Sequence, residues 1–202
     1  MITIIACIGS DGSLGVDDRL IFHIKEDMRR FRSITSGNIC LMGRKTFDPI
    51  IKMNGKPLSN RINAVLTRDE KYTPRYGETS YTSIDRILNH HETMSEGDKK
   101  VFVIGGEQTY RIFLPFVSEV LLTHVGKHVE EATSFYPIEL QESLGFYPVE
   151  TSEDYYSEKY DAYYKFVRYV KDRMIESGGN DGGNQGDRTI QFSGGNIRSE
   201  ER

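Results

Sequence analysis

The chain has 202 residues, of which 37% are hydrophobic, 11% aromatic and 28% charged. This length suits one domain of ordinary size, and 12 tyrosines with 10 phenylalanines supply enough bulky side chains to exclude disorder of the whole chain. The formal net charge of -4 excludes a strongly basic surface. We therefore expect no nucleic acid and no anionic membrane among the partners, and a small molecule as substrate.

The N-terminal sequence and the cysteines indicate the compartment. The first residues, Met-Ile-Thr-Ile-Ile-Ala-Cys-Ile, lack the basic region and the cleavage site of a signal peptide, and no apolar run reaches the ~18 residues of a membrane span. Cys7 and Cys40 each lie in an apolar, strand-like run, which favours buried free thiols over a disulfide or a metal pair. We expect a cytoplasmic protein.

The predicted elements alternate along the chain. Apolar, β-branched runs predict strands at Ile2–Ile8, Asn38–Met42, Ala64–Thr67, Val101–Ile104, Val120–Val125 and Tyr163–Val170. Spacing and capping signals predict helices at Glu26–Ile34, at Ile84–Leu88 after a Ser83 cap, and at Gln108–Leu114 before Pro115. Several strands are apolar on both faces, which indicates a mainly parallel sheet between helices. The last strand follows a polar turn region, Asp154–Asp161, and should form an antiparallel edge hairpin.

The composition changes near residue 177. Ser177–Arg202 holds 7 of the 19 glycines and has no aliphatic periodicity. One imperfect Gly-Gly-Asn-Asp-Gly-Gly stretch is similar to calcium-binding nonapeptide repeats, but those sites need stacked copies. We expect a domain of residues 1–172 followed by a flexible Gly-rich tail, residues 173–202.

Two strand-to-helix turns could accept phosphate groups. Gly43-Arg44-Lys45-Thr46 opens a predicted helix, so backbone N–H groups and the positive helix end could face an anion there. Gly105-Gly106 begins a second such turn, where the missing side chains allow close approach. Neither turn is a P-loop or the dinucleotide fingerprint, and the first alone could equally be a plain turn with exposed cations. Together they suggest an extended ligand along the carboxyl ends of the strands.

Asp27 lies in the first predicted helix. Its spacing alone favours an exposed first-turn acid that interacts with the helix dipole, and its place on the Phe31 side is the one local indication of burial. The histidines predict no metal site, because His124 and His128 fall in a strand and a loop, where this spacing does not bring side chains together. No serine or cysteine has a paired base at a recognisable nucleophile turn.

Eight short motifs, in order, resemble the dihydrofolate reductase family over residues 1 to about 170. They are Ile2-Thr-Ile-Ile-Ala-Cys7, Leu14-Gly15, Asp27 with Phe31, Met42-Gly-Arg-Lys-Thr-Phe47, Pro57-Leu-Ser-Asn-Arg61, Val65-Leu-Thr-Arg68, Val103-Ile-Gly-Gly-Glu-Gln-Thr-Tyr110 and Leu121-Leu-Thr-His124. The resemblance implies an α/β fold with a central, mostly parallel eight-stranded sheet, an antiparallel C-terminal edge strand and four flanking helices. It also implies NADPH-dependent reduction of dihydrofolate to tetrahydrofolate, by hydride transfer to C6 and protonation of N5, for one-carbon and thymidylate synthesis.

On the substrate side, the resemblance implies a pterin pocket with Asp27 as its acid, braced by Thr123. A carboxylate there accepts paired hydrogen bonds from the pterin and favours the protonated substrate. Arg61 would hold the α-carboxylate of the glutamate tail, and Phe22 stands among the catalytic residues at the family's tryptophan. The other implied substrate-binding residues are Ile5, Ala6, Met28, Phe31, Ile50, Leu58 and Ile104. Antifolate inhibitors are expected to bind here.

On the cofactor side, the resemblance implies NADPH, with Arg44 and Arg68 at the 2′-phosphate and the paired glycines at the pyrophosphate. The loop punctuated by Gly9, Gly12 and Gly15 would be a mobile lid over the nicotinamide. The implied cofactor-binding residues are Ala6, Cys7, Leu14, Gly15, Arg19, Leu20, Gly43, Arg44, Lys45, Thr46, Leu66, Thr67, Arg68, Ile104, Gly105, Gly106, Glu107, Gln108, Thr109, Tyr110 and Thr133. We expect no metal and a monomer.

The chain departs from the family pattern in several places. Leu20-Ile21-Phe22 replaces Leu-Pro-Trp, which affects the proton route, and Ser59-Asn60 replaces Pro-Gly in a turn that Asn tolerates. Ala132 stands where an acid is common, which affects lid closure, and an insertion at Lys52–Lys56 shifts Ile50 by up to a turn.

Two alternatives remain open from the sequence. One is an NADPH-dependent reductase of another pterin or of a pyrimidine precursor of riboflavin, although a clamp such as Arg61 needs a glutamate tail. The other is a nucleotide-binding scaffold that has lost turnover, for which Ile21-Phe22 and the Gly-rich tail are the support.

Overall fold

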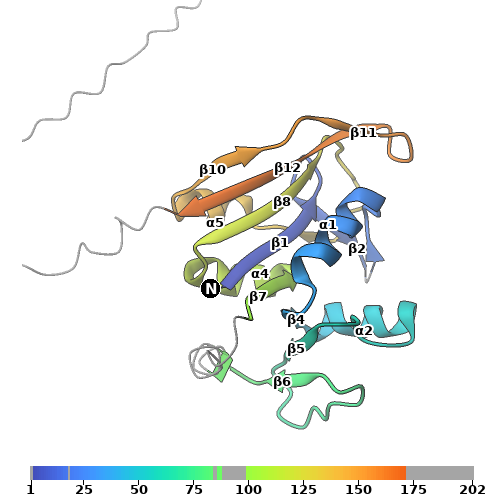
Figure 1. Cartoon of the computed structure of the whole chain (residues 1–202), viewed down its shortest axis with the longest axis vertical. Coiled ribbons are helices and arrows are strands. Elements are labelled where there is room, and N and C mark those ends of the chain that lie inside the picture. Colours follow the sequence, from blue (N-terminus) through green and yellow to red (C-terminus); the bar gives the residue numbers. More distant parts are fainter. Residues whose placement is uncertain (1, 18, 84–85, 88–98, 172–202) are drawn as a thin grey trace, which may run out of the picture. The chain divides into compact units, whose positions relative to one another are not determined.

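The computed structural model describes residues 2–17, 19–83, 86–87 and 99–171 (Figure 1). These residues all belong to the first of the two units into which the chain divides, Met1–Asp172. The predicted tail, residues 173–202, lies outside the described residues, and its flexibility stays a prediction. Within the described ranges, no helix combines the length and apolarity needed to cross a membrane.

A nine-stranded sheet forms the centre of the unit, in the order β10-β12-β8-β1-β7-β4-β5-β6, with β11 paired to β12 off this path. The strands are β1 (Ile2–Ile8), β4 (Ile39–Gly43), β5 (Ile62–Leu66), β6 (Thr79–Tyr81), β7 (Val101–Gly105), β8 (Glu119–Val125), β10 (Phe146–Thr151), β11 (Tyr155–Ser157) and β12 (Ala162–Lys171). The pairs from β8 through β6 are parallel, and β12 is antiparallel to β8, β10 and β11. The expected mostly parallel, eight-stranded path is confirmed.

The C-terminal part of the sheet differs from the prediction in one respect. The last strand, β12, is antiparallel as expected, but it lies between β8 and β10, so β10 is the edge strand. Phe146 is the one buried residue of β10, and a strand exposed along its length gives no alternation to detect. The predicted turn region also contains β11, so only residues 158–161 turn.

Besides residues 86–87, which are helical, the described part of the chain has four α-helices beside the sheet: α1 (Lys25–Thr35), α2 (Arg44–Asn54), α4 (Glu107–Phe113) and α5 (Ile138–Ser143). α4 ends at Phe113, one residue before the predicted end and two before Pro115, and the chain then continues into a one-turn 3-10 helix, η1 (Leu114–Phe116). The Ser83 cap is present, since the N–H of Arg86 donates to Ser83 Oγ at 3.4 Å. Residues 84–85 and 88 of that predicted helix lie outside the described residues.

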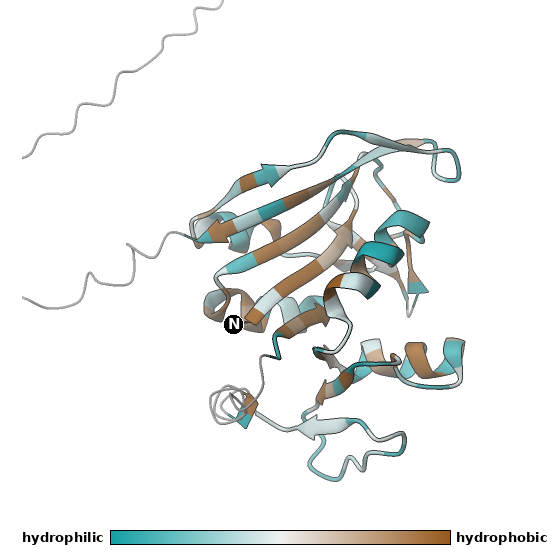
Figure 2. Cartoon of the chain, in the orientation of Figure 1, coloured by the Kyte–Doolittle hydropathy of each residue, from teal (hydrophilic) through white to brown (hydrophobic). Residues whose placement is uncertain are grey.

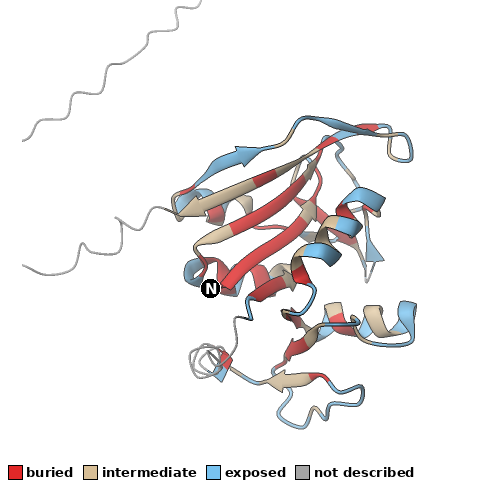
Figure 3. Ribbon diagram, in the orientation of Figure 1, coloured by how far each residue is buried: buried red, intermediate tan, exposed pale blue. Residues whose placement is uncertain are grey.

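Successive residues of the central strands face different helices. In β1, Ile4 and Ile8 pack in the largest core cluster with Phe113 of α4, whereas Ile5 packs in a cluster with Phe31 of α1. Figure 2 shows the apolar colouring along the central strands, and Figure 3 shows that these same strands are buried. Each such side chain stabilises the folded chain by ~1.5–3 kcal/mol when it is fully buried. The core therefore holds the ends of the strands, and the turns that follow them, in fixed positions.

A second, small sheet has the order β3-β2-β9. Its strands are β2 (Ser13–Val16), β3 (Arg19–Leu20) and β9 (Ser134–Phe135). We call it the small sheet. The sequence did not predict it, because strands of two to four residues are too short to show a period. It contains most of the predicted lid.

Candidate active site

Asp27 is buried in the first turn of α1, with 7% of its surface exposed. The interpretation of Asp27 as an exposed acid that interacts with the helix dipole is therefore wrong. Thr123 of β8, 96 residues away in the chain, donates its hydroxyl hydrogen to Asp27 Oδ1 at 2.5 Å. Burial raises the pKa of Asp27, and the Thr123 hydrogen bond and the Arg30 charge offset part of this rise. The carboxyl group can therefore hold a proton at a higher pH than an exposed aspartate.

Both cysteines are free thiols, as predicted. Cys7 is half-buried in β1 and lies opposite Thr123 of β8 in the strand register. Burial, and secondarily the Asp27 charge, raises the pKa of Cys7 well above its ordinary value. Cys40 is buried in β4, and burial raises its pKa to about 11. Both thiols are therefore protonated near neutral pH.

An apolar wall adjoins Asp27 on the α1 face of the sheet. Ile5 packs in one cluster with Phe31, while Ile50 and Leu58 pack in a neighbouring cluster around α2. Ile104 packs against both clusters and joins them. The structure thus brings together five of the predicted substrate-binding residues. Ala6 is an exception, because its side chain packs in the core cluster on the opposite face.

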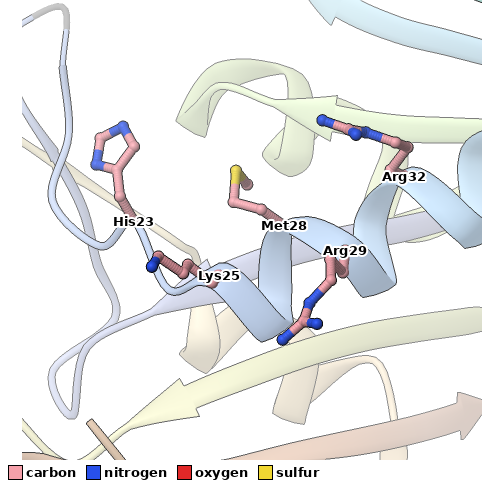
Figure 4. Close-up of a pocket in the computed structure, with 5 residues that line it drawn as sticks. All are labelled: His23, Lys25, Met28, Arg29 and Arg32. Atoms are coloured by element: carbon pink, nitrogen blue, oxygen red, sulfur yellow. The ribbon is translucent and has the colours of Figure 1, made fainter. Parts of the chain in front are cut away.

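Met28, the next predicted substrate residue, lines a groove along the outer side of α1 rather than the apolar wall. His23, Lys25, Arg29 and Arg32 line the same groove. Figure 4 shows Met28 and Arg32 on one side of the helix, and His23 on the segment before it. Arg29 forms an ion pair with Glu26 at 2.6 Å, which offsets its charge. The positive charge of the groove therefore comes mainly from Lys25 and Arg32.

Arg61 is held at the end of α1 farthest from Asp27. Its Nε–H donates to Ser59 O at 2.9 Å, and its Nη1 donates to Thr35 Oγ1 at 3.3 Å. The guanidinium lies 5.8 Å from the centre of the Phe31 ring. The turn before it contains Asn60 at a left-handed φ of 55°, as the sequence predicted. These contacts fix the direction of the guanidinium beside the apolar wall.

Phe22 is packed as a wall residue. It is 3% exposed and clusters with Val125, Ala162 and Tyr164. Its ring makes an edge contact with Tyr160 at 5.2 Å between centroids. A phenylalanine carries no proton donor, so the structure gives Phe22 a packing role, and its expected place among the catalytic residues stays a prediction. Sequence reasoning missed Tyr160, whose hydroxyl oxygen accepts a hydrogen bond from the N–H of His23 at 2.6 Å.

The two predicted phosphate turns lie side by side. β4 and β7 are neighbouring parallel strands, with Met42 opposite Gly105 in register. Gly43 and Gly106 are the N-cap residues of α2 and α4, and neither helix start has a side-chain cap. The first-turn N–H groups are therefore not satisfied by a capping side chain, which suits a ligand phosphate.

Glycine suits these turns because neighbouring threonine side chains approach the backbone closely. A Cβ at Gly43 would lie 3.0 Å from Thr109 Oγ1, and one at Gly106 would lie 3.2 Å from Thr46 Oγ1. Gly105 has a φ of +130°, which other residues rarely adopt. The structure thus places five predicted cofactor residues around one small cradle that any added side chain would fill.

The predicted 2′-phosphate cations lie at the surface near these turns. Arg44, Lys45 and Arg68 are exposed, and Gln108 is exposed on α4. Arg44 Nη1 lies 3.7 Å from Asp69 Oδ2, an acid that the sequence analysis did not consider. Leu66 is partly buried against the core, and Thr67 is buried, with its Oγ1 accepting the N–H of Asp69 at 3.1 Å.

Two predicted cofactor residues have buried side chains. Leu14 and Tyr110 belong to the largest core cluster, and the Tyr110 hydroxyl donates to Ile5 O at 3.0 Å. Their side chains support the site from the core side. The structure gives these two side chains a supporting role, and the expected cofactor contacts of Leu14 and Tyr110 stay a prediction.

The lid residues gather in the small sheet. Arg19 and Leu20 are exposed on β3, and a Cβ at Gly15 would lie 2.9 Å from Arg19 O. Thr133 Oγ1 accepts the N–H of Asp17 at 2.6 Å, and the N–H of Thr133 donates to Gly15 O at 2.9 Å. Thr133 thus makes the lid contact that Ala132, without a polar side chain, cannot make.

A further acid missed in the sequence organises the loop beyond β5. Glu78 is buried, and its Oε1 accepts hydrogen bonds from the Tyr72 hydroxyl at 2.7 Å and from the N–H of Arg75 at 3.1 Å. These bonds lower the pKa of Glu78 against the opposing effect of burial. Tyr76 of this loop contacts Phe47 of α2, with 6.5 Å between ring centroids.

The fold and site define an α/β enzyme with a buried acid on one side of a phosphate-accepting cradle, which is the arrangement of a nucleotide-dependent reductase. In the described ranges, no group of three His, Cys, Asp or Glu side chains is placed to hold a metal ion.

The comparisons with known proteins identify the family. The family model described as dihydrofolate reductase matches residues 1–171. A dihydrofolate reductase of Bacillus subtilis (strain 168) is 32% identical over 181 residues, which cover 89% of this chain and 99% of the relative. A bifunctional dihydrofolate reductase-thymidylate synthase of Paramecium tetraurelia is 36% identical over 57% of this chain and 24% of its own. The chain belongs to the dihydrofolate reductase family, and it is an NADPH-dependent oxidoreductase.

A solved structure supports the fold. It is a dihydrofolate reductase from Enterococcus faecalis complexed with NADP(H) and RAB-propyl, with a TM-score of 0.73 and 24% identity. The match covers 85% of this chain and 96% of that chain.

Proposed function

We propose that this chain reduces 7,8-dihydrofolate to 5,6,7,8-tetrahydrofolate with NADPH, and that Asp27 is its catalytic carboxyl group. The reaction consumes one proton and one hydride, and NADP⁺ is the second product. The buried Asp27–Thr123 pair, at the end of an apolar wall that would accept a flat ring, carries the proposal.

Asp27 would bind the pterin and keep it in its reactive form. Its carboxylate accepts hydrogen bonds from the 2-amino group and the adjacent ring N–H, while Thr123 fixes its rotation through Oδ1. A negative charge at this place favours the substrate protonated at N5, which accepts hydride at C6. We infer that the proton reaches N5 from solvent, since the Asp27 carboxylate is occupied by the 2-amino group and ring N–H of the pterin, and Phe22 carries no transferable proton.

The glycine cradle would hold the cofactor. NADPH supplies the hydride when it is bound. The uncapped helix starts after Gly43 and Gly106 present N–H groups to the pyrophosphate, and the exposed Arg44 and Arg68 would face the 2′-phosphate.

Arg61 distinguishes this proposal from reduction of a different pterin or of a pyrimidine. Two hydrogen bonds and the Phe31 ring hold its guanidinium beside the apolar wall, where the α-carboxylate of a glutamate tail would arrive. A substrate without that tail makes no use of it. The scaffold alternative is disfavoured because burying the Asp27 carboxylate costs stability, which a protein without turnover has no reason to retain.

Three finer proposals accompany the activity. Antifolate inhibitors would bind in the pocket of Asp27, and the dihydrofolate reductase from E. faecalis crystallised with RAB-propyl supports this by analogy. A cytoplasmic location is supported by the two free thiols. A monomer stays a prediction from the sequence.

The test follows NADPH oxidation by the full chain with dihydrofolate, with a pterin lacking the glutamate tail, and with no acceptor. We expect stoichiometric oxidation with dihydrofolate and a higher KM for the tail-less pterin. Equal efficiency with both acceptors would favour the other-pterin alternative. NADPH binding without oxidation by either acceptor would favour the scaffold.

A further inference from the structure

Glu107 connects the cofactor cradle to the small sheet. It is the first residue of α4, directly after the paired glycines. Its Oε2 accepts the backbone N–H of Phe135 at 3.0 Å, and its Oε1 accepts Nε–H of Arg111 at 3.3 Å. The second contact joins neighbours on one helix, but the first joins α4 to a strand 28 residues further along the chain.

The strand that Glu107 reaches is the one that holds the lid. Phe135 belongs to β9, which pairs with β2 through Ser13 and Gly15. Thr133 lies two residues before Phe135. Its N–H donates to Gly15 O, and its Oγ1 accepts the N–H of Asp17. A two-residue strand opens readily unless other contacts fix it. The Glu107 carboxylate therefore supports the lid contacts from the far side of β9.

A second contact fixes the β9 segment, but it does not replace the hydrogen bond between Glu107 and the Phe135 N–H. The Tyr136 ring lies 5.3 Å from the Tyr110 ring of α4 and is buried. It anchors the end of β9 in the core. Phe135 itself is 37% exposed, and the acceptor that the structure gives its N–H is the Glu107 carboxylate.

The charge of Glu107 opposes the function of the turn in which it stands. A first-turn acid is favourable to the helix dipole, but the same helix start would receive the pyrophosphate in the proposed function. Arg111 offsets part of this negative charge through its ion pair. Hydrogen-bond acceptance from Phe135 and repulsion of the cofactor are thus two separable properties of one side chain.

We propose that Glu107 is a positioning residue that couples the cofactor cradle to the lid through the Phe135 N–H. The inference rests on the proposed function. The Glu107 carboxylate holds β9, β9 pairs with β2, and Thr133 directly before β9 holds Asp17. The lid in turn would cover the nicotinamide end of the site. The coupling needs the acceptor oxygen and not the charge.

Two substitutions separate these properties. Glu107→Gln keeps an acceptor oxygen for Phe135 and removes the charge, whereas Glu107→Ala removes both. Glu139→Ala is the matched control, because Glu139 is an exposed first-turn acid of α5 whose carboxylate has no partner among the described residues. Each full-length variant is measured for Tm, for hydride transfer in single turnovers, for NADPH affinity, and for amide exchange at Asp17, Thr133 and Phe135.

For Glu107→Ala we expect faster exchange at all three amides and hydride transfer slower by about three- to tenfold, which is the weight of an ordinary intramolecular hydrogen bond. Glu107→Gln should restore hydride transfer and bind NADPH more tightly than the unsubstituted chain. Glu139→Ala should change none of these rates. Identical behaviour of the Ala and Gln variants, or a lower Tm with unchanged exchange at Asp17 and unchanged hydride transfer, would overturn the coupling.

The exchange measurements on cofactor-free protein keep the two proposals apart. If the chain failed to oxidise NADPH with dihydrofolate, the proposed function would fall, while faster exchange in Glu107→Ala would still establish the tie to the lid. If turnover were normal and exchange at Asp17 unchanged in Glu107→Ala, only the coupling would fall.

Discussion

The proposed pterin side and the proposed cofactor side of the site are built in opposite ways. On the pterin side, a buried carboxyl group and apolar side chains come from the interiors of α1, β1 and β8. On the cofactor side, backbone N–H groups and exposed cations come from turns at the carboxyl ends of β4, β5 and β7. Substitutions on the first side should therefore change chemistry and stability together, and those on the second side should change affinity and cofactor choice.

The largest effect is expected for Asp27→Asn. Asparagine keeps the size of the side chain but not the charge that favours a protonated pterin. At neutral pH the rate of hydride transfer should fall by ~10²–10⁴. Lowering the pH should recover part of it, because substrate then arrives already protonated. Single-turnover rates between pH 5 and 8 measure both effects, and near-normal turnover of the Asn variant at neutral pH would remove Asp27 from the mechanism.

The same variant should be more stable, not less, at neutral pH. Burial raises the pKa of Asp27 above its unfolded value, so its contribution to stability is greatest below that unfolded value and is lost as the pH rises through the folded value. Asp27→Asn should accordingly gain most over the unsubstituted chain at neutral pH, and the gain should vanish on acidification. Urea titrations at several pH values give the free energy of unfolding; a loss of stability at pH 7 would contradict this account.

Arg61→Leu should have the next largest effect, and only on the substrate side. A charge-assisted contact contributes ~1.5–3 kcal/mol, so KM for dihydrofolate should rise at least about tenfold. A pterin without the glutamate tail should react as before. Steady-state kinetics with both substrates, with Arg29→Leu on the exposed face of α1 as control, measure the split; equal losses for both substrates would make Arg61 a structural residue.

On the cofactor side, Arg44→Ala and Arg68→Ala should each weaken NADPH binding by about tenfold and leave NADH binding unchanged, because only NADPH carries the 2′-phosphate. Lys71→Ala, beyond Asp69 in the same exposed turn, is a suitable control. Dissociation constants for both cofactors, measured by fluorescence, decide the matter. A parallel loss with NADH would show that these arginines stabilise the turn instead.

Asp69→Asn should give the smallest effect, in the opposite direction. Its carboxylate lies 3.7 Å from Arg44 Nη1, and both side chains are about half exposed, so it competes with a phosphate for the same cation. NADPH should bind about two- to threefold more tightly to the variant, and the gain should disappear at high salt. A weaker NADPH complex would mean that Asp69 orients Arg44 rather than competing for it.

The fold was predictable where burial leaves a pattern in the sequence. The predicted strands that became β1, β4, β7 and β8 are continuous apolar runs, and they form the middle of the sheet. The edge strand β10 and the small sheet were missed, because exposed or very short strands depend on their partners and have no period of their own. The position of β12 inside the sheet is likewise set by pairing with β8 and β10.

The site was predictable from ordered motifs and not from local spacing. The helix containing Asp27 has acids and cations on neighbouring positions. The sequence pattern of this helix alone could not show that Asp27 would be buried beside Thr123, which follows 96 residues later. Asp69 and Tyr160 were missed for the same reason, since each acts through a contact with a distant segment. Leu14 and Tyr110 lie in motifs of the family but serve the core, which a motif cannot distinguish from ligand contact.

The inside position of β12 has a consequence for synthesis on the ribosome. β8 pairs with β1 on one side and with β12 on the other, and β12 is the last strand that the structure describes. Until residue 171 has emerged, one edge of β8 is open and apolar, which is the kind of edge that pairs with other chains. The hairpin before β12 also supplies Tyr160, which holds the entry to α1. The helix that contains Asp27 precedes these segments in the chain, and it is therefore fully fixed in place only after residue 171 has emerged.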